Sequence, residues 1–316
     1  MELSKPSDAA RRGAAVVSDI TRRERDIAGG VVRVVLMGAL VLALLVLVVL
    51  IVDVVTGGWS VLSSSLGDLL TGTLGSKPET SGLSQAIRGS FYIAVFVVIV
   101  AVPLGVAAAI YLEEYASNGR FARFIDINIR NLAGVPSVVY GILGLTIFVK
   151  MLGSITGPDS NGRSVISAGL TLSVLVLPII IITSAEAIRA VPNGIREAGF
   201  GVGATRWEVV RSHVLPYAAP GILTGVVLSV ARALGEAAPL ILVGATTGFL
   251  TTGESYLPSS LQERFTALPI VISTWSGRPG VDWRSSTSAA IVVMLAIVLV
   301  ANAGAILLRN HYEKKR

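Results

Sequence analysis

Residues 34–52 read VVLMGALVLALLVLVVLIV, an apolar run without a single charged side chain. A helix rises 1.5 Å per residue, so about 20 apolar residues cross the ~30 Å of hydrocarbon in a bilayer. The run therefore predicts a membrane-spanning helix. A signal peptide is the alternative, but this apolar core is too long, roughly thirty residues precede it, and no small-residue cleavage site follows. We expect a span that the protein retains.

Five more apolar stretches follow, and the one near residue 230 carries two charges, Arg232 and Glu236. Because the stretches are continuous rather than alternating, they predict helices and not barrel strands. The expected fold is all-α, a polytopic membrane protein with six transmembrane helices. Four prolines inside these spans can each kink a helix: Pro103, Pro136, Pro178 and Pro239. The five stretches are residues 91–110, 132–149, 165–185, about 217–245, and 289–308.

Composition agrees with a membrane protein and excludes several other classes. Of 316 residues 53% are hydrophobic and 15% charged, whereas soluble domains have ~25% charged residues. The chain has no cysteine, which excludes disulfides and cysteine-ligated metals. Its two histidines, His213 and His311, lack a metal-binding spacing, so no metal site is expected. The net charge of +6 comes from basic residues spread between apolar blocks, which does not indicate nucleic-acid binding.

The distribution of basic residues predicts the orientation in the membrane. With the amino terminus inside, 18 of the 26 lysines and arginines fall on the cytoplasmic side and seven on the other. Cytoplasmic loops carry the excess of positive charge, so both termini should lie in the cytoplasm of a prokaryotic cell, with the chain crossing the plasma membrane several times. Arg232 is the remaining basic residue, and it lies within a span.

Four regions are expected along the chain. Residues 1–30 form a basic cytoplasmic tail, solvated or lying on anionic lipid. Residues 31–316 form the transmembrane domain. Within it, residues 186–216 form a cytoplasmic loop, and residues 246–285, longer than a simple connection needs, should form a folded cap on the outer side.

The cytoplasmic loop contains EAGFGVGATRWEVVRSHVLP, residues 197–216. Gly203 can adopt the left-handed conformation that ends a helix. Thr205 and Glu208 have the spacing of a capping box, which opens the next helix, and Pro216 should stop that helix before the fifth span. The segment therefore predicts a helix–turn–helix protruding from the inner membrane surface, where another protein can grip it.

This segment resembles the EAA loop of the ABC importer permease family, whose pattern is EAA, three residues, Gly, nine residues, then I-x-L-P. The chain matches this pattern at the family's spacing, apart from two residues that do not shift the register. Gly199 replaces the third alanine, and His213 replaces the isoleucine. The resemblance implies the type I (MetI-like) permease fold of ABC importers. It also implies that this loop is the coupling helix gripped by an ATPase subunit. An ordinary amphipathic loop is the alternative. The expected ATPase-coupling residues are Glu197, Ala198, Gly199, Gly203, Leu215 and Pro216.

The charged pair in the fifth span is the candidate substrate site. A charge near the bilayer centre costs at least ~2.5–3.5 kcal/mol, so Arg232 and Glu236 should face protein or water. Their i, i+4 spacing places both on one helix face. They either neutralise each other and fix the helix rotation, or Arg232 meets an anion on the translocation path. A guanidinium can hold two phosphate oxygens at once, with Glu236 as a competing partner that prevents overly tight binding.

The string ARALGEAAPL, residues 231–240, resembles the phosphate-specific permeases of the PstA type. So do residues 131–145 (NLAGVPSVVYGILGL), residues 203–228 and residues 267–275 (ALPIVISTW). Ala237 departs from the threonine usual there. In that family the arginine and the glutamate are implicated in phosphate passage, which carries over to Arg232 and Glu236. The resemblance implies four partners besides phosphate and membrane lipid: a PstC-like sister permease, two copies of a PstB-like ATPase, and a PstS-like phosphate-binding protein.

The chain has no G-x-x-x-x-G-K-[ST] motif to cradle ATP phosphates. We therefore expect a transport subunit rather than an enzyme, without a cofactor of its own, because ATP and Mg²⁺ would sit on the partner ATPase. Two alternatives remain open. The chain could be an importer permease for another anion, or a secondary transporter or channel that needs no ATPase, which would leave the coupling loop without a purpose.

Overall fold

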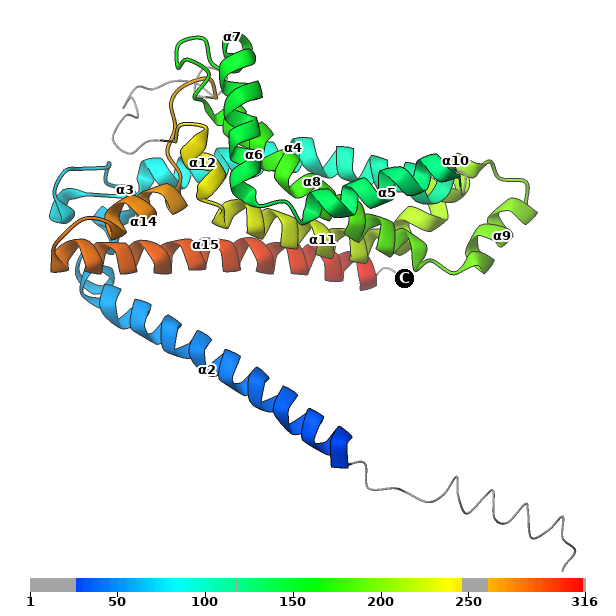
Figure 1. The fold of residues 1–316 in the computed structure, drawn as a ribbon, viewed down its shortest axis with the longest axis horizontal. Coiled ribbons are helices and arrows are strands. Elements are labelled where there is room, and N and C mark those ends of the chain that lie inside the picture. Colours follow the sequence, from blue (N-terminus) through cyan, green and yellow to red (C-terminus); the bar gives the residue numbers. More distant parts are fainter. Residues whose placement is uncertain (1–26, 117–118, 246–260, 315–316) are drawn as a thin grey trace, which may run out of the picture. The chain divides into compact units, whose positions relative to one another are not determined.

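The computed structural model describes residues 27–116, 119–245 and 261–314, and divides into two compact units, Met1–Asp53 and Val54–Arg316 (Figure 1). In the first unit the described residues form the beginning of a single helix, α2 (Ile27–Ser64), which contains the expected first span. Its side chains are exposed from Gly30 to Asp53. A helix that is apolar on every face suits a lipid environment or contact with other helices. The predicted basic tail lies largely outside the described residues.

The second unit consists of helices joined by turns and loops, and its described residues contain no strand. Three segments, η2, η3 and η4, are π-helical turns, in which the hydrogen bonds run from residue i+5 to residue i. The elements after α2 are α3 (Leu66–Thr71), η1 (Pro78–Thr80), α4 (Ser84–Ile110), η2 (Tyr111–Tyr115), α5 (Arg120–Ala133), α6 (Ser137–Gly144), η3 (Leu145–Met151), α7 (Gly153–Thr156), α8 (Val165–Arg189), α9 (Asn193–Gly201), α10 (Arg206–Val209), η4 (Val210–Val214), α11 (Leu215–Gly235), α12 (Ala238–Leu242), α14 (Leu268–Ser276) and α15 (Val281–Lys314).

Helix α8 forms the centre of this unit, and α4 and α11 pack directly against it (Figure 1). Small residues bring the helices close together. A Cβ at Gly105 of α4 would collide with Ile180 of α8, and one at Gly225 of α11 would collide with Thr183. Such small residues are typical of contacts between membrane helices, since lipid supplies no hydrophobic drive and close packing must hold the helices together.

Five of the described helices are long and apolar enough to cross a membrane, and a bent pair of helices makes a sixth span. The six-span prediction is confirmed if the pair is counted as one. The expected third span, residues 132–149, has the wrong start, because α5 and α6 meet at an angle of 100°. Pro136 lies at this bend and disfavours helical conformation in the residue before it. After the bend, the second helix of this pair begins at Ser137 and not at Leu132.

Part of the expected outer cap lies at residues 246–260, outside the described residues. The described remainder contains α14, whose Trp275 packs against Trp283 with 5.5 Å between the ring centroids. Helix α15 starts at Val281, earlier than the expected Ala289. The apolar run identified the lipid-crossing part of α15, whereas the polar first turns are helical because they pack under α14.

Candidate functional site

The cytoplasmic loop folds as two helices joined by the expected left-handed turn. Helix α9 ends in a Schellman motif, in which the N–H of Ala204 donates to the carbonyl of Gly199 at 3.2 Å and that of Gly203 to Phe200 at 2.9 Å. Gly203 has φ of +83°, a conformation that other residues adopt only at a cost. The prediction for Gly203 is confirmed. The turn fixes where the next helix starts.

The capping box at the start of α10 is also present. The Thr205 N–H donates to Oε2 of Glu208 at 2.7 Å, and the Glu208 N–H donates to the Thr205 hydroxyl at 3.4 Å. Gly199 is buried in the angle between α9 and α10, where a Cβ would meet the Val209 side chain. An alanine at position 199 would therefore push the two helices apart. Glu197 and Ala198 lie on the exposed side of α9.

The helix opened by the capping box does not stop at Pro216, contrary to the prediction. Instead α10, η4 and α11 run on as one helical segment of 30 residues, Arg206–Gly235. Pro216 has no N–H and clashes with the carbonyl four residues earlier in a regular helix. The π-helical turn at Val210–Val214 shifts the backbone hydrogen bonds by one residue just before Pro216. The helix therefore accommodates the proline and continues.

The fifth span breaks instead at Glu236, where the sequence predicted continuous helix. Glu236 has extended backbone angles, φ −84° and ψ 108°, and α12 begins two residues later. Pro239 explains the position of the break, because in a continuous helix its ring would clash with the carbonyl of Gly235, the last residue of α11. The pair of charges therefore lies at a break in the span and not on one uninterrupted helix face.

Arg232 occupies the last turn of α11, where the negative end of the helix dipole favours a cation. Its Nε lies 3.6 Å from Oε1 of Glu236, which is an ion pair but too long for a hydrogen bond. The side chains are 43% and 22% exposed, respectively. The guanidinium of Arg232 makes no hydrogen bond to the described part of the chain. The N–H donors of this guanidinium can therefore bind an oxyanion without first breaking a hydrogen bond within the protein.

The neighbours of the break come from α6. Tyr140 lies in the same apolar core as Ala233 and Ala237, and its hydroxyl donates to the Leu132 carbonyl at 2.8 Å. One residue on, Gly141 lets α12 approach closely, since a Cβ there would collide with Pro239. Ala237, at the position where the resembling permeases have threonine, packs against the apolar core. No hydroxyl is available there to assist Arg232.

An ion pair that the sequence analysis missed ties the coupling loop to the end of α4. Arg196 of α9 donates from Nε and Nη2 to Oε1 of Glu114, at 3.1 and 2.8 Å. The same guanidinium donates to the carbonyls of Ile188 and Val191 and to the Asn193 side chain. The two charged side chains are only 18% and 8% exposed. This arginine is fully occupied in holding α8, α9 and η2 together.

The residues on either side of Glu114 contact the same region. Glu113 forms an ion pair with Arg189, the last residue of α8. The guanidinium of Arg206, at the start of α10, lies 5.6 Å from the centre of the Tyr115 ring. The run of acidic residues after an apolar span, facing a basic loop, predicts attraction between them, but only the packing shows which residue meets which.

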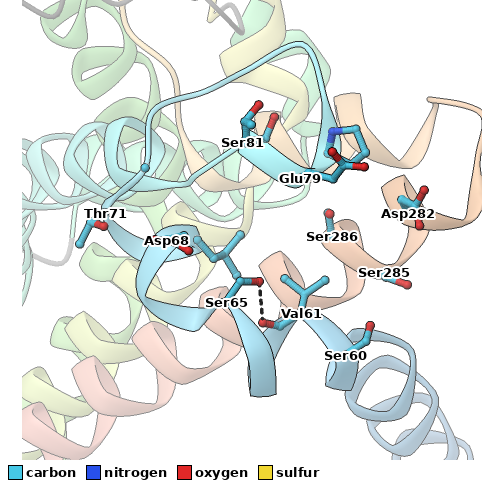
Figure 2. A pocket seen from close by; sticks show the side chains of 14 residues that line it. Ser60, Val61, Ser65, Asp68, Thr71, Glu79, Ser81, Asp282, Ser285 and Ser286 are labelled. Carbon is cyan, nitrogen blue, oxygen red and sulfur yellow. Dashed lines mark hydrogen bonds between the residues drawn. The ribbon is translucent and has the colours of Figure 1, made fainter.

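A polar cavity of about 630 Å³ lies at the opposite end of this unit, between the end of α2, α3, η1 and the start of α15 (Figure 2). Hydroxyl groups and three carboxylates, Asp68, Glu79 and Asp282, line it. No lysine or arginine is among its lining residues. Its charge is the wrong sign for an anion, so this cavity does not extend the Arg232 site.

Comparison with known proteins identifies the family. Residues 101–315 match the binding-protein-dependent transport system inner membrane component family. The chain belongs to this family. It is a permease subunit of an ABC importer, a multi-span protein of the prokaryotic plasma membrane, and ATP hydrolysis in such importers is performed by separate ATPase subunits.

Several relatives have names that refer to phosphate. The chain is 31% identical to phosphate transport system permease protein PstA 1 of Mycobacterium tuberculosis, over 87% of this chain and 86% of that one. It is 30% identical to PstA of Xylella fastidiosa, over 77% and 80% of the two chains. A probable ABC transporter permease of Bacillus subtilis, YqgH, is 38% identical over 54% of each chain. The match to YqgH thus spans about half the length of that relative.

Solved structures agree on the fold. A bacterial alginate ABC transporter, in complex with an alginate-bound periplasmic protein, matches with a TM-score of 0.61 over 93% of this chain and 98% of that chain, at 17% identity. The MetNI methionine ABC transporter matches with a TM-score of 0.54 over 73% and 94%, also at 17% identity. The permease therefore has the type I (MetI-like) ABC importer fold, as the sequence predicted.

Proposed function

We propose that this permease subunit imports inorganic phosphate at the expense of ATP. One observation carries the proposal. The helical segment Arg206–Gly235 starts at the capping box of the coupling loop and ends one turn after Arg232, a partly exposed arginine at a break in the span. At 1.5 Å per residue this segment is about 45 Å long. A movement of the loop therefore moves the helix that presents the guanidinium.

Phosphate is the proposed anion. The guanidinium of Arg232 presents parallel donors that match two oxygens of a tetrahedral oxyanion, and it stays charged at any physiological pH. Relatives that are 30–31% identical over most of the chain carry phosphate transport in their names. Glu236, at 3.6 Å, would compete with the anion and help to release it.

The coupling loop is the proposed contact with an ATPase subunit. It presents three large apolar side chains to solvent: Phe200, Val202 at 84% exposure, and Trp207. Apolar groups of this kind on a polar protrusion mark a protein interface. Behind them the Schellman motif, the capping box and the Arg196–Glu114 ion pair keep the loop rigid, so that a force applied to the loop reaches α4, α8 and α11.

The proposed assembly contains this chain, a sister permease, two copies of an ATPase subunit and a phosphate-binding protein. The loop would lie in the cytoplasm with both termini, and the other end of the bundle would receive phosphate from the binding protein. Nucleotide binding would rock the helices between inward- and outward-facing states, so that the path never opens to both sides at once.

Reconstitution tests this function directly. Proteoliposomes that contain the whole complex, with its ATPase side facing the lumen, should take up ³²P-phosphate. Uptake should require ATP in the lumen and the binding protein outside. Unlabelled sulfate or chloride should not compete. Uptake by this chain without an ATPase would show a secondary transporter or channel. ATP-driven uptake of a different anion, with phosphate inactive, would keep the importer and replace its substrate.

The loop is tested separately by co-purification. Val202→Asp should release the ATPase from the detergent-solubilised complex, because a charge would enter an apolar contact. Met151→Asp provides the control, since Met151 is apolar and 71% exposed but lies at the end of the bundle away from the loop. Retention of the ATPase by Val202→Asp would remove this surface from the coupling contact.

A further inference from the structure

A basic pocket lies at the end of the bundle opposite the coupling loop. Its volume is about 670 Å³, and three cationic side chains line it: Lys150, Arg163 and Arg264. Lys150 lies on η3, which follows α6. Arg163 lies two residues before α8, whose far end leads into the loop. The lining residues include no carboxylate, although Asp159 and Glu263 are neighbours in sequence of lining residues.

The wall that carries Arg163 is a tightly built turn. Asn161 and Gly162 both have positive φ, 53° and 75°. The Gly162 N–H donates to the Gly157 carbonyl at 2.7 Å, and its own carbonyl accepts from the Ser167 hydroxyl. A Cβ at Gly162 would collide with the carbonyl of Val149, so the turn lies directly against η3. This packing holds Arg163 and Lys150 on adjoining walls.

The wall that carries Arg264 is fastened to the same turn. The Ser160 hydroxyl donates to the carbonyl of Gln262 at 2.7 Å, and the Gln262 side chain donates to the carbonyl of Ile155 at 3.1 Å. The N–H of Ile166 donates to the carbonyl of Leu261 at 3.2 Å. Three hydrogen bonds thus join segments about a hundred residues apart, and the cations converge on a pre-formed pocket rather than on loose loops.

The pocket adjoins the Arg232 site through two elements. The stem of Arg163 packs against Gly244, two residues after α12, and α12 begins immediately after the break at Glu236. Five residues of helix span only about 8 Å. On the other side, the α6–η3 segment runs from Gly141, which packs against Pro239 of α12, to Lys150 in the pocket. The basic pocket therefore lies at one end of these short elements, and the break that follows Arg232 lies at the other.

We propose that this pocket is an anion-receiving site, which takes a hydrated tetrahedral oxyanion such as inorganic phosphate before it reaches Arg232. The inference rests on the proposed function. A cleft lined by charges of one sign concentrates counter-ions within it. The volume accommodates an oxyanion with part of its water, since each water occupies ~30 Å³. Three exposed cations hold the anion loosely enough to pass it on.

Neutralisation with a matched control tests the role in transport. The triple variant Lys150→Gln, Arg163→Gln, Arg264→Gln in the reconstituted complex should lower the maximal phosphate uptake about tenfold at saturating binding protein. The control triple Lys77→Gln, Arg88→Gln, Arg284→Gln removes the same charge from exposed positions at the same end of the bundle, outside the pocket. The control should transport normally.

A cysteine probe tests binding without transport. Because the natural chain has no cysteine, Lys150→Cys introduces a single thiol into it. In the assembled complex, a negatively charged methanethiosulfonate should label this thiol about tenfold faster than a positively charged one, because Arg163 and Arg264 attract it. Inorganic phosphate should slow the labelling more than chloride at matched ionic strength. Adding Arg163→Gln and Arg264→Gln should abolish both effects.

The outcomes separate this inference from the function on which it rests. Equal labelling rates for the two reagents, or equal protection by phosphate and chloride, would overturn the anion site while wild-type uptake of phosphate leaves the function standing. A further outcome is a triple variant that reaches the wild-type maximal uptake but needs a higher concentration of binding protein. That result would show that the three cations form a docking surface for the binding protein, and it would also overturn the anion site. A wild-type complex that does not import phosphate would overturn the proposed function itself.

Discussion

Two arginine–glutamate pairs in this permease have the same chemistry and opposite geometry. Arg196 binds Glu114 through two donors, at 3.1 and 2.8 Å, and spends its remaining donors on backbone carbonyls and an amide. Arg232 faces Glu236 through one contact of 3.6 Å, with much of its side chain exposed. The first pair joins three segments of the chain, whereas the second lies at a break within one span.

The difference separates a structural arginine from one that can bind a ligand. A buried guanidinium whose donors are all used fixes its surroundings, and removing it leaves an unpaired buried charge. A guanidinium with unused donors contributes little to the fold and can exchange its weak partner for an anion. Spacing in the sequence would have favoured the opposite assignment, because Arg232 and Glu236 are four residues apart and Arg196 and Glu114 are 82 apart.

The largest effect on stability is expected for Arg196→Ala. The variant leaves the carboxylate of Glu114, 8% exposed, buried without its partner, which costs about 3–5 kcal/mol. The thermal unfolding midpoint of the purified complex should fall markedly, and the ATPase should be lost with the loop. Arg189→Ala, at a more exposed pair, should cost only about 0.2–1 kcal/mol. Equal destabilisation by the two variants would contradict the distinction.

Arg232→Ala should have the reverse profile, with normal stability and assembly but little transport. Two hydrogen bonds to an anion, each worth about 1.5–3 kcal/mol, would be lost, which corresponds to a fall in phosphate uptake of about a hundredfold or more. Arg232→Lys should recover part of the uptake, since it restores charge without the fork. Unchanged uptake in Arg232→Ala would remove this residue from the transport path.

Gly203→Ala tests whether coupling requires the left-handed turn between α9 and α10. Its φ of +83° costs a residue with a Cβ about 1–2 kcal/mol, and no atom lies near the added methyl, so the effect is purely conformational. The binding-protein-stimulated ATPase rate should fall several-fold. Gly201→Ala is the matched control, because its Cβ also meets open space and its backbone is helical. A similar loss in both variants would point to a cause other than the turn.

The smallest effect is expected for Glu236→Gln. An ion pair with this exposure is worth about 0.2–1 kcal/mol, so stability should hardly change. Without the competing carboxylate, phosphate should bind more tightly and leave more slowly. Both the half-saturating concentration and the maximal uptake rate should therefore fall a few-fold, as measured by initial rates of ³²P uptake. A rise in the half-saturating concentration would show that Glu236 assists binding instead.

Local signals predicted some elements of the loop well. The capping box at Thr205 and the left-handed Gly203 depend on neighbouring residues only, and both are present. The effect of proline was harder to predict. Pro103 and Pro178 lie inside continuous helices, Pro216 is absorbed by a π-helical turn, and Pro239 breaks its span. Each has the same local chemistry, so the packing around the helix decided the outcome.

The amino-acid sequence by itself determined that this chain is a helical membrane protein with about six spans, a helix–turn–helix loop and a pair of charges within a span. These features follow from apolar length, capping chemistry and the cost of burying charge, all of which act within one segment. Only the tertiary structure decided that Glu114 holds Arg196, that Glu236 ends a helix, and that Lys150, Arg163 and Arg264 converge on one pocket. Contacts between distant segments depend on how whole helices pack, and no local pattern records that packing.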